Sequence, residues 1–378
     1  MMRAPLTILT ALAAFAASAL LLPSCGSKAE LENAALFLPE PTVYNREWQP
    51  ARLALATDTE EVWVKGRGHS TFAQPKHPYA LKLHQPLPLC GLPARRHWVL
   101  LANFFDHSLL RNALAMEVAR QTSLKEVTPQ GRFITLKTNG EWQGIYWLCE
   151  RVKDKVSPTD SLLQLDVYHW EAQRKRGLPI DTLPAAPIDT LSFIDWWLVH
   201  ELCMNAEPNG PRSCFVRITA DGKAMAGPVW DFDMAFNEVG VDNGGDLRPL
   251  KFKSMHSLPP FLKGKSIRWL SVDSFYCDRS PIMARLLADK AFRHAAQKRW
   301  HELRPSFNRL TRRMETWSRQ IRPSAPSDQD KWNAREPARF DASATWKEAV
   351  GKLKSTYEQR LKALDRLFES LISFTSSS

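Results

Sequence analysis

Two short segments carry carboxylate and amide side chains in a pattern that suits metal and phosphate chemistry. Asn205 and Glu207 follow an apolar helical stretch, and Asp231 and Asp233 alternate with aromatic residues further along the chain. If the second segment is extended, its two carboxylates project to the same side. Carboxylate and amide oxygens are ligands that Mg²⁺ shares with phosphate groups. The pattern therefore predicts a magnesium site in a cleft, and a solvated acidic turn is the simpler alternative.

A glycine-bearing turn and a strand lysine could supply positive charge to such a site. Arg67 lies between two glycines, where backbone N–H groups can approach an anion closely and the guanidinium can fork onto a phosphate. Lys82 alternates with Leu81 and Leu83, so it points to the opposite face of a predicted strand. A strand lysine behind a glycine-bearing loop is how protein kinases hold nucleotide phosphates. A plain turn and a solvated edge lysine are the alternatives.

Three further charged residues stand where a partner is expected. Glu201 lies one helical turn before Asn205, beside an apolar stripe. Glu150 ends a predicted strand and could pair with Lys82 or with Arg111. Arg111 lies in the first turn of a predicted helix, where the helix dipole disfavours a cation, so a carboxylate or phosphate partner is expected for it.

The elements that position these residues follow from apolar periodicity and turn signals. Apolar runs predict strands at 62–64, 79–83, 98–101, 133–137, 142–148, 215–218 and 223–226. The hairpin turns are Asn139-Gly140 and Asp221-Gly222. Helices are predicted over 109–121, capped by Asp106 or Ser108, and over 192–204, capped by Asp189 or Thr190.

The remaining segments complete an α+β arrangement. Residues 155–188 are polar and predict a loop-rich insertion, and residues 238–280 are expected to be irregular. The last part is basic and predicts helices over 281–304, 307–322 and 344–373. The apolar face of the last helix favours a packed helical hairpin over a coiled-coil seam. Strands and a helix first, with helices last, suit a two-lobed enzyme.

The N-terminus predicts an exported, lipid-anchored protein. Arg3 precedes an uncharged apolar stretch that ends at Leu22-Pro23-Ser24-Cys25, which resembles a bacterial lipobox. Residues 1–24 are then a signal peptide, 25–45 a tether and 46–378 the folded domain, with a lipid on Cys25. Because no Asp follows the cysteine, the outer membrane of the cell envelope is favoured. A plain signal peptide or a single membrane anchor is the alternative.

Composition is that of an ordinary globular protein, with 44% hydrophobic and 24% charged residues over 378 positions. The formal net charge of +11 suits anionic lipid, nucleic acid or phosphorylated ligands, and export makes nucleic acid the least expected of these. The other cysteines have neither CxxC pairs nor zinc spacing, so structural burial is expected for them. They are Cys90, Cys149, Cys203, Cys214 and Cys277.

Six segments, taken together, resemble the motifs of one family. They are GRGHSTF (66–72), HPYALKL (77–83), WVLLANFFDHSLLRNALA (98–115), TPQGRFITLKTNGEWQGIYWLCERVK (128–153), FIDWWLVHELCMNAE (193–207) and GPVWDFDMAF (227–236). In this order they resemble the CotH kinase family, over a motif core of 60–237. The resemblance implies a divergent two-lobed protein-kinase-like fold with a helical C-terminal part at 281–375. It also implies that ATP and Mg²⁺ are bound and that a protein is phosphorylated.

The resemblance assigns roles residue by residue. Lys82, with Arg67 nearby, would hold the phosphates, and Glu150 and Glu201 would also belong to the nucleotide site. Asn205 would shape the catalytic segment and the metal site.

Two acidic positions complete the implied site. Asp231 would be the metal carboxylate, and Asp233 would support it. Glu207 stands where the family pattern Asn-x-Asp has its catalytic aspartate, so the carboxylate is kept but extended by one methylene. The catalytic set implied is therefore Asn205, Glu207 and Asp231.

Three functions follow as hypotheses. The first is a monomeric ATP- and Mg²⁺-dependent phosphotransferase that acts on Ser or Thr of an envelope or secreted protein. The second is a lipid-anchored binding or adhesion protein that keeps the fold without chemistry. The third is a surface protein that binds anionic polymers through C-terminal basic residues such as Arg312 and Arg319, although a solvated helix face explains those charges.

Overall fold

The computed structural model describes residues 31–39, 44–55, 58–165, 187–209, 213–242, 249–250, 267–333 and 343–373. All of them lie in one compact unit, Leu31–Ser378. The predicted signal peptide and Cys25 lie outside the described residues, as does most of the predicted insertion at 155–188. No helix among the described residues is long and apolar enough to cross a membrane.

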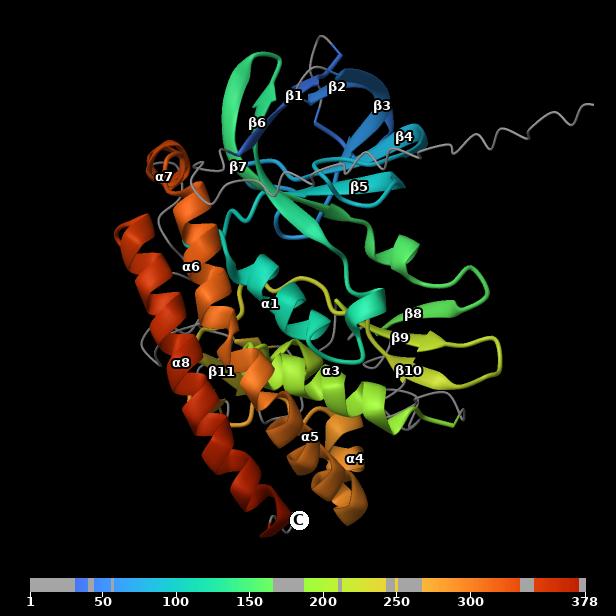
Figure 1. The fold of residues 1–378 in the computed structure, drawn as a ribbon, viewed down its shortest axis with the longest axis vertical. Helices are drawn as coiled ribbons and strands as arrows, with labels where there is room; N and C mark the ends of the chain where they lie inside the picture. Colours follow the sequence, from blue (N-terminus) through green and yellow to red (C-terminus); the bar gives the residue numbers. More distant parts are fainter. Residues whose placement is uncertain are drawn as a thin grey trace, which may run out of the picture. The chain divides into compact units, whose positions relative to one another are not determined.

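Seven strands close into a barrel in the first part of the chain (Figure 1). They are β1 (Glu32–Phe37), β2 (Gln49–Leu55), β3 (Asp58–Gly66), β4 (Tyr79–Leu87), β5 (Arg95–Leu101), β6 (Gly131–Thr138) and β7 (Glu141–Glu150). Their order is β1-β2-β3-β4-β5-β7-β6, and the parallel pairing of β1 with β6 closes the barrel. The predicted tether at 25–45 is therefore wrong for Glu32–Phe37, because these residues pair on both edges with other strands.

Side chains alternate in direction along the strands. Those on one face fill the barrel, and those on the other face join a second core formed with the helices. Leu81, Leu100 and Leu148 point into the barrel, where they are buried with one another. Val99 and Cys149, on the opposite faces of β5 and β7, join the larger core formed with the helices. A strand buried on both faces has no polar side, which explains the continuous apolar runs at 98–101 in β5 and 145–149 in β7.

The first helix, α1 (Arg111–Arg120), follows β5; its N-cap position is Leu110, which makes no side-chain bond, and the predicted Asp106 instead binds the N–H of the first helical residue from four positions further back. Asp106 accepts the backbone N–H of Arg111 at 2.8 Å and that of Ser108 at 2.9 Å. The expected partner of the Arg111 side chain is the same carboxylate, at 3.4 Å. One buried acid thus neutralises the unusual first-turn cation.

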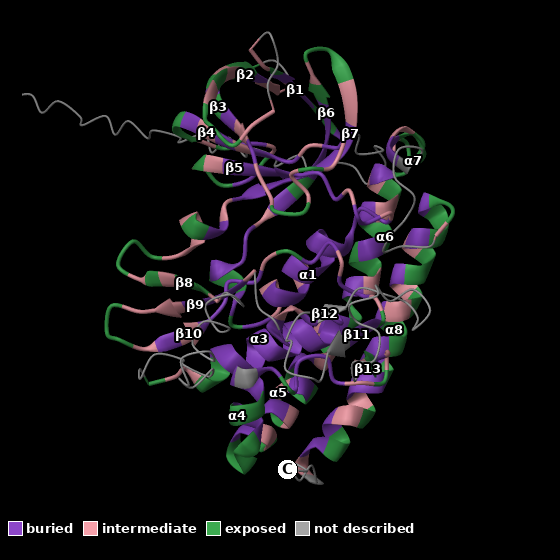
Figure 2. Ribbon diagram, turned by 180° about the vertical axis from the view of Figure 1, so that it is seen from behind, coloured by how far each residue is buried: buried purple, intermediate pink, exposed green. Residues whose placement is uncertain are grey.

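Helix α3 (Thr190–Leu202) is the centre of the second part, and Figure 2 shows it buried along most of its length. Its predicted cap is confirmed, since Asp189 accepts the N–H of Ser192 at 2.8 Å. The remaining strands form two three-stranded sheets. They are β8 (Ser161–Leu165), β9 (Cys214–Ile218), β10 (Ala224–Ala226), β11 (Val239–Asp242), β12 (Pro249–Leu250) and β13 (Ile267–Leu270). β8 lies in the expected insertion, and β11 and β13 lie in the stretch expected to be irregular.

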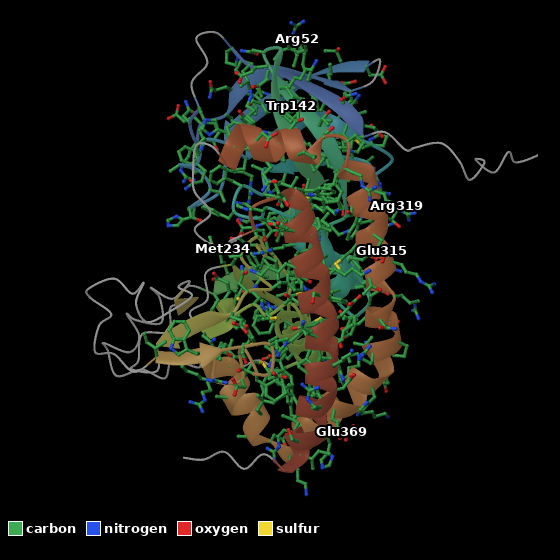
Figure 3. All side chains as sticks on the ribbon, turned by 90° about the vertical axis from the view of Figure 1, so that its left-hand side faces the viewer. Arg52, Trp142, Met234, Glu315, Arg319 and Glu369 are labelled. Atoms are coloured by element: carbon green, nitrogen blue, oxygen red, sulfur yellow. The ribbon has the colours of Figure 1, made fainter. Side chains whose placement is uncertain are left out.

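Five α-helices lie in the described residues from 281 onward, and their packing confirms the α+β class. They are α4 (Pro281–Ala288), α5 (Lys290–Asn308), α6 (Leu310–Ile321), α7 (Ala325–Asn333) and α8 (Trp346–Ser370). The helix predicted over 281–304 is divided, because Asp289 caps the start of α5. The apolar face of α8 is buried, so the packed arrangement is confirmed. Figure 3 shows Glu315 and Arg319 on α6 beside α8, where Glu315 pairs with Lys354.

Helix α7, which the sequence did not predict, attaches the C-terminal helices to the barrel. Lys76, from the loop between β3 and β4, donates to Asp328 of α7 at 2.7 Å and to the carbonyl of Ile145 at 2.8 Å. Asp328 in turn accepts the N–H of Ile145 at 2.6 Å. Only glycine fits at the preceding position, because a Cβ on Gly144 would lie 2.1 Å from Asp328 Oδ2. The loop that carries Arg67 is therefore anchored at its far end.

Candidate active site

The segment after α3 holds the first pair of predicted site residues. The Asn205 N–H donates to the carbonyl of His200 at 2.9 Å, which turns the chain sharply as the helix ends. The Asn205 Oδ1 then accepts the N–H of Glu207 at 3.0 Å, so the amide shapes this loop as expected. Asn205 is 5% exposed, and its Nδ2 has no hydrogen-bond partner among the described residues. Buried N–H donors are normally hydrogen-bonded, so this one is available to a ligand.

The second pair lies in the loop after β10. Asp231 is exposed and adopts a left-handed backbone with φ of +72°, whereas Asp233 is 7% exposed. Ser213 Oγ donates to Asp231 Oδ2 at 2.9 Å. Strained backbone of this kind persists where surrounding contacts hold it, and it concentrates at functional sites.

Phe232, between the two aspartates, is held from both sides. Its N–H donates to Asn112 Oδ1 of α1 at 2.8 Å. Its ring packs 5.1 Å from the His200 ring, measured between centroids. Burial lowers the pKa of His200 to about 3, so this imidazole is neutral. The sequence offered no signal for the Asn112 contact beyond its place in the first turn of a helix.

Two sets of electrostatic interactions link these segments: Glu207 and Asp231 both act on Cys214, and Asp231 and Asp233 both act on Arg67. Burial raises the pKa of the Cys214 thiol well above its usual range, and the nearby Glu207 and Asp231 carboxylates add to the rise. Burial lowers the pKa of the Arg67 guanidinium, and Asp231 and Asp233 are among the groups that oppose that shift. Arg67 therefore lies near Asp231 and Asp233, and Glu207 and Asp231 both lie near Cys214.

A comparison with protein-family models shows to which family the chain belongs. Residues 64–182 and 185–364 match the model described as CotH kinase protein, which covers most of the chain. This chain belongs to the CotH kinase family. The match includes the glycine-bearing loop, the segment after α3 and the Asp231 segment. It also extends through the C-terminal helices as far as α8, beyond the motif core seen in the sequence. A comparison with curated proteins found no match.

A CotH kinase would be expected to use a nucleotide and a metal, and the residues around Asp231 fit both. The described residues contain no group of three or more His, Cys, Asp or Glu side chains that could hold a metal by themselves. Mg²⁺ does not require one, since it is commonly bound by one or two carboxylates together with substrate phosphates and water. Asp231 and Asp233 could supply the carboxylates. Arg67, whose guanidinium lies 5.3 Å from the Trp230 ring, could supply positive charge for the phosphates.

Two predicted residues of the nucleotide site lie on different faces of the barrel wall. Lys82 lies on the outer face of β4 opposite His97, and among the described residues it makes no ion pair. Glu150 is fully buried and pairs with Arg95 at 2.7 Å and with Lys155 at 3.2 Å. Neither Lys82 nor Arg111 is therefore the partner of Glu150.

Glu201 is committed to the packing of the CotH kinase domain. It accepts the backbone N–H groups of Tyr276 at 2.7 Å and Cys277 at 2.9 Å, and the indole N–H of Trp197 at 2.8 Å. Arg360 of α8 completes the set at 3.0 Å, and both charged side chains are fully buried. Burial raises the pKa of the Glu201 carboxyl, while Arg360 and the two backbone donors oppose the rise.

Breaking this ion pair is expected to destabilise the fold. Replacing Arg360 with methionine should lower the free energy of unfolding by about 3–5 kcal/mol, because a buried carboxylate is left without its cation. Urea unfolding followed by tryptophan fluorescence measures the change. Adding Glu201→Gln to the same variant should recover part of the loss, since the amide oxygen still accepts the N–H donors. A single variant as stable as the wild type would contradict this account.

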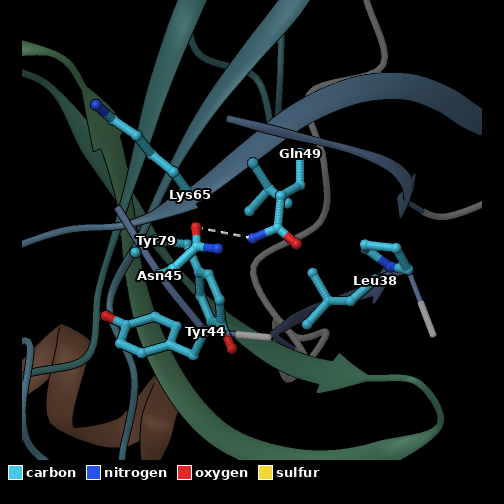
Figure 4. Close-up of a pocket in the computed structure, with 9 residues that line it drawn as sticks. Leu38, Tyr44, Asn45, Gln49, Lys65 and Tyr79 are labelled. Atoms are coloured by element: carbon cyan, nitrogen blue, oxygen red, sulfur yellow. Dashed lines mark hydrogen bonds between the residues drawn. The ribbon is translucent and has the colours of Figure 1, made fainter. Parts of the chain in front are cut away.

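A small pocket lies on the barrel beside the glycine-bearing loop (Figure 4). It is lined by Leu38, Pro39, Tyr44, Asn45, Gln49, Val64, Lys65, Gly66 and Tyr79. Gln49 donates to Asn45 Oδ1 across it at 3.0 Å. The Tyr44 hydroxyl and the Arg67 N–H both donate to the carbonyl of Pro78. This pocket contains none of the predicted acidic residues, and it lies at the start of the Arg67 loop.

Proposed function

We propose that this protein is an ATP- and Mg²⁺-dependent phosphotransferase that modifies Ser or Thr of an envelope or secreted protein. The observation that carries the proposal is the position of Arg67 against the Trp230 ring, next to Asp231 in the sequence, within a CotH kinase domain. In this reading the barrel and the helical part act as the two lobes of a kinase-like enzyme. The site between them receives the nucleotide.

Each residue has a distinct role in the proposed transfer. Asp231, supported by Asp233, would hold Mg²⁺, and the metal would supply positive charge for the transferring phosphoryl group. Arg67 pairs with the phosphates, and Lys82 approaches them from the outer face of β4. The acceptor hydroxyl oxygen forms a bond to the γ-phosphorus as the bond from that phosphorus to the β-phosphate oxygen breaks, and ADP leaves. Glu207 accepts the hydroxyl proton.

The setting of the reaction is part of the proposal. A lipid on Cys25 would tether a monomer to the cell envelope and place its acceptor there or outside the cell.

Calorimetry on the mature domain, residues 26–378, tests the proposal directly. Titration with ATP should give heat of binding when Mg²⁺ is present and none when it is replaced by a chelator. Transfer of labelled phosphate to a library of Ser- and Thr-containing peptides is the following assay. Absence of binding at millimolar ATP would overturn the proposal, and a lipid-anchored binding protein that retains the fold would then take its place.

A further inference from the structure

A chain of two buried amide side chains connects the end of β5 to the Asp231 segment. The Phe232 N–H donates to Asn112 Oδ1 at 2.8 Å, and Asn112 Nδ2 donates to Asn103 Oδ1 at 2.9 Å. Asn103 Nδ2 then donates to the carbonyl of Leu109 at 3.2 Å. Asn103 and Asn112 are 4% and 3% exposed, so water does not compete for these bonds.

The donor-to-acceptor direction of this chain of hydrogen bonds is fixed by the groups at its two ends. It begins on a backbone N–H, which can only donate, and it ends on a backbone carbonyl, which can only accept. Each amide must therefore turn its oxygen toward Phe232 and its nitrogen toward Leu109. Asparagine, with one acceptor and one donor group on a short stem, is the side chain that meets both demands at each position.

The first bond of the chain acts on the residue between the two candidate metal carboxylates. Asp231 has a φ of +72°, a conformation that needs external support. Ser213 binds the Asp231 carboxylate itself, and the backbone next to it is held by the bond from Phe232 to Asn112 and by the packing of the Phe232 ring on His200. We infer that Asn112 is a positioning residue that holds Asp231 and Asp233 in place for the metal. This use of the carboxylates rests on the proposed function, whereas the positioning itself does not.

The wild-type protein provides a first test by hydrogen exchange. The Phe232 amide lies in an irregular segment, yet it should exchange about a hundredfold more slowly than an unprotected amide, because its acceptor is buried. Exchange at the unprotected rate would overturn the inference without any variant.

Two variants of Asn112 test the chain of hydrogen bonds. Asn112→Leu, which has a similar size but no polar group, should speed exchange in residues 228–236 by about tenfold or more, because Phe232 loses its acceptor. Asn112→Asp keeps an acceptor for Phe232 and should retain most of this protection. Thr135→Val is the matched control, since it also removes a side-chain hydrogen bond, a part-buried one to Asn33 in the barrel. It should leave residues 228–236 unchanged.

Magnesium dependence separates this inference from the proposed function. If the wild type binds ATP, Asn112→Leu should raise the Mg²⁺ concentration required for half-maximal binding by about tenfold, and Asn112→Asp by less. If the wild type binds no ATP, the proposed function fails, and the exchange data alone still decide the inference. Equal exchange at residues 228–236 in Asn112→Leu and the wild type would overturn it. A faster exchange spread evenly over the whole domain would overturn it as well, because the effect would then be general destabilisation.

Discussion

Asp231→Asn is expected to abolish phosphate transfer, with a loss of at least about a thousandfold, because the carboxylate proposed to hold the metal, which would neutralise the transferring group, is replaced by a neutral amide. Asparagine is the informative substitution here. Like aspartate it tolerates the left-handed backbone, so the φ of +72° costs little and the change isolates the charge. Calorimetry should show that Mg²⁺-dependent ATP binding is lost with the activity.

The control for this variant is Asp221→Asn, on the turn between β9 and β10. Asp221 is also an exposed aspartate, and its carboxylate accepts the Thr219 hydroxyl rather than facing the site. It should leave both ATP binding and transfer unchanged. If Asp231→Asn binds ATP with the wild-type dependence on Mg²⁺, the metal role of Asp231 is wrong.

Glu207→Gln is expected to lower the rate of transfer by about a hundredfold or more, since it removes the group proposed to accept the hydroxyl proton. ATP binding should stay at the wild-type level, because Glu207 is assigned to the acceptor and not to the nucleotide. A rate assay at saturating ATP, combined with calorimetry, separates the two effects.

Glu207→Asp provides the comparison, because it restores the Asn-x-Asp pattern of the family. A shift of about one ångström at a reacting group can change a rate about a hundredfold. The aspartate variant should therefore transfer phosphate at least as fast as the wild type if the loop adjusts to the shorter side chain. Equal rates for wild type and Glu207→Gln would show that another group, or none, receives the proton.

Local signals in the sequence were sufficient for most elements of the fold. The Asn139-Gly140 turn, the Asp189 cap and the bond of Asp106 to the start of α1 each involve residues within a few positions of one another. Their geometry depends on short-range bonding, which sequence patterns report directly. The α+β class and the buried face of α8 followed from periodicity in the same way.

Two of the elements that were not predicted, β1 and α7, depend on distant partners. β1 lies in a stretch expected to be a tether, and it is a strand because it pairs with β2 on one edge and with β6 on the other. Helix α7 is polar and short, and Asp328 on it is placed by Lys76, 252 residues earlier. Neither partner produces a sequence pattern near the segment that it stabilises. Local sequence analysis therefore predicts neither β1 nor α7.

The sequence by itself determined which residues could do chemistry: it identified Arg67, Asn205, Glu207, Asp231 and Asp233 by type and spacing. Only the tertiary structure decided which other residues support the site and which are used in packing. It committed Glu201 to Arg360, 159 residues away, and it supplied Asn112 as the support of Phe232, 120 residues away. The physical reason is that a buried charge or N–H group must be paired, and the partner is whichever side chain folding brings within hydrogen-bond distance.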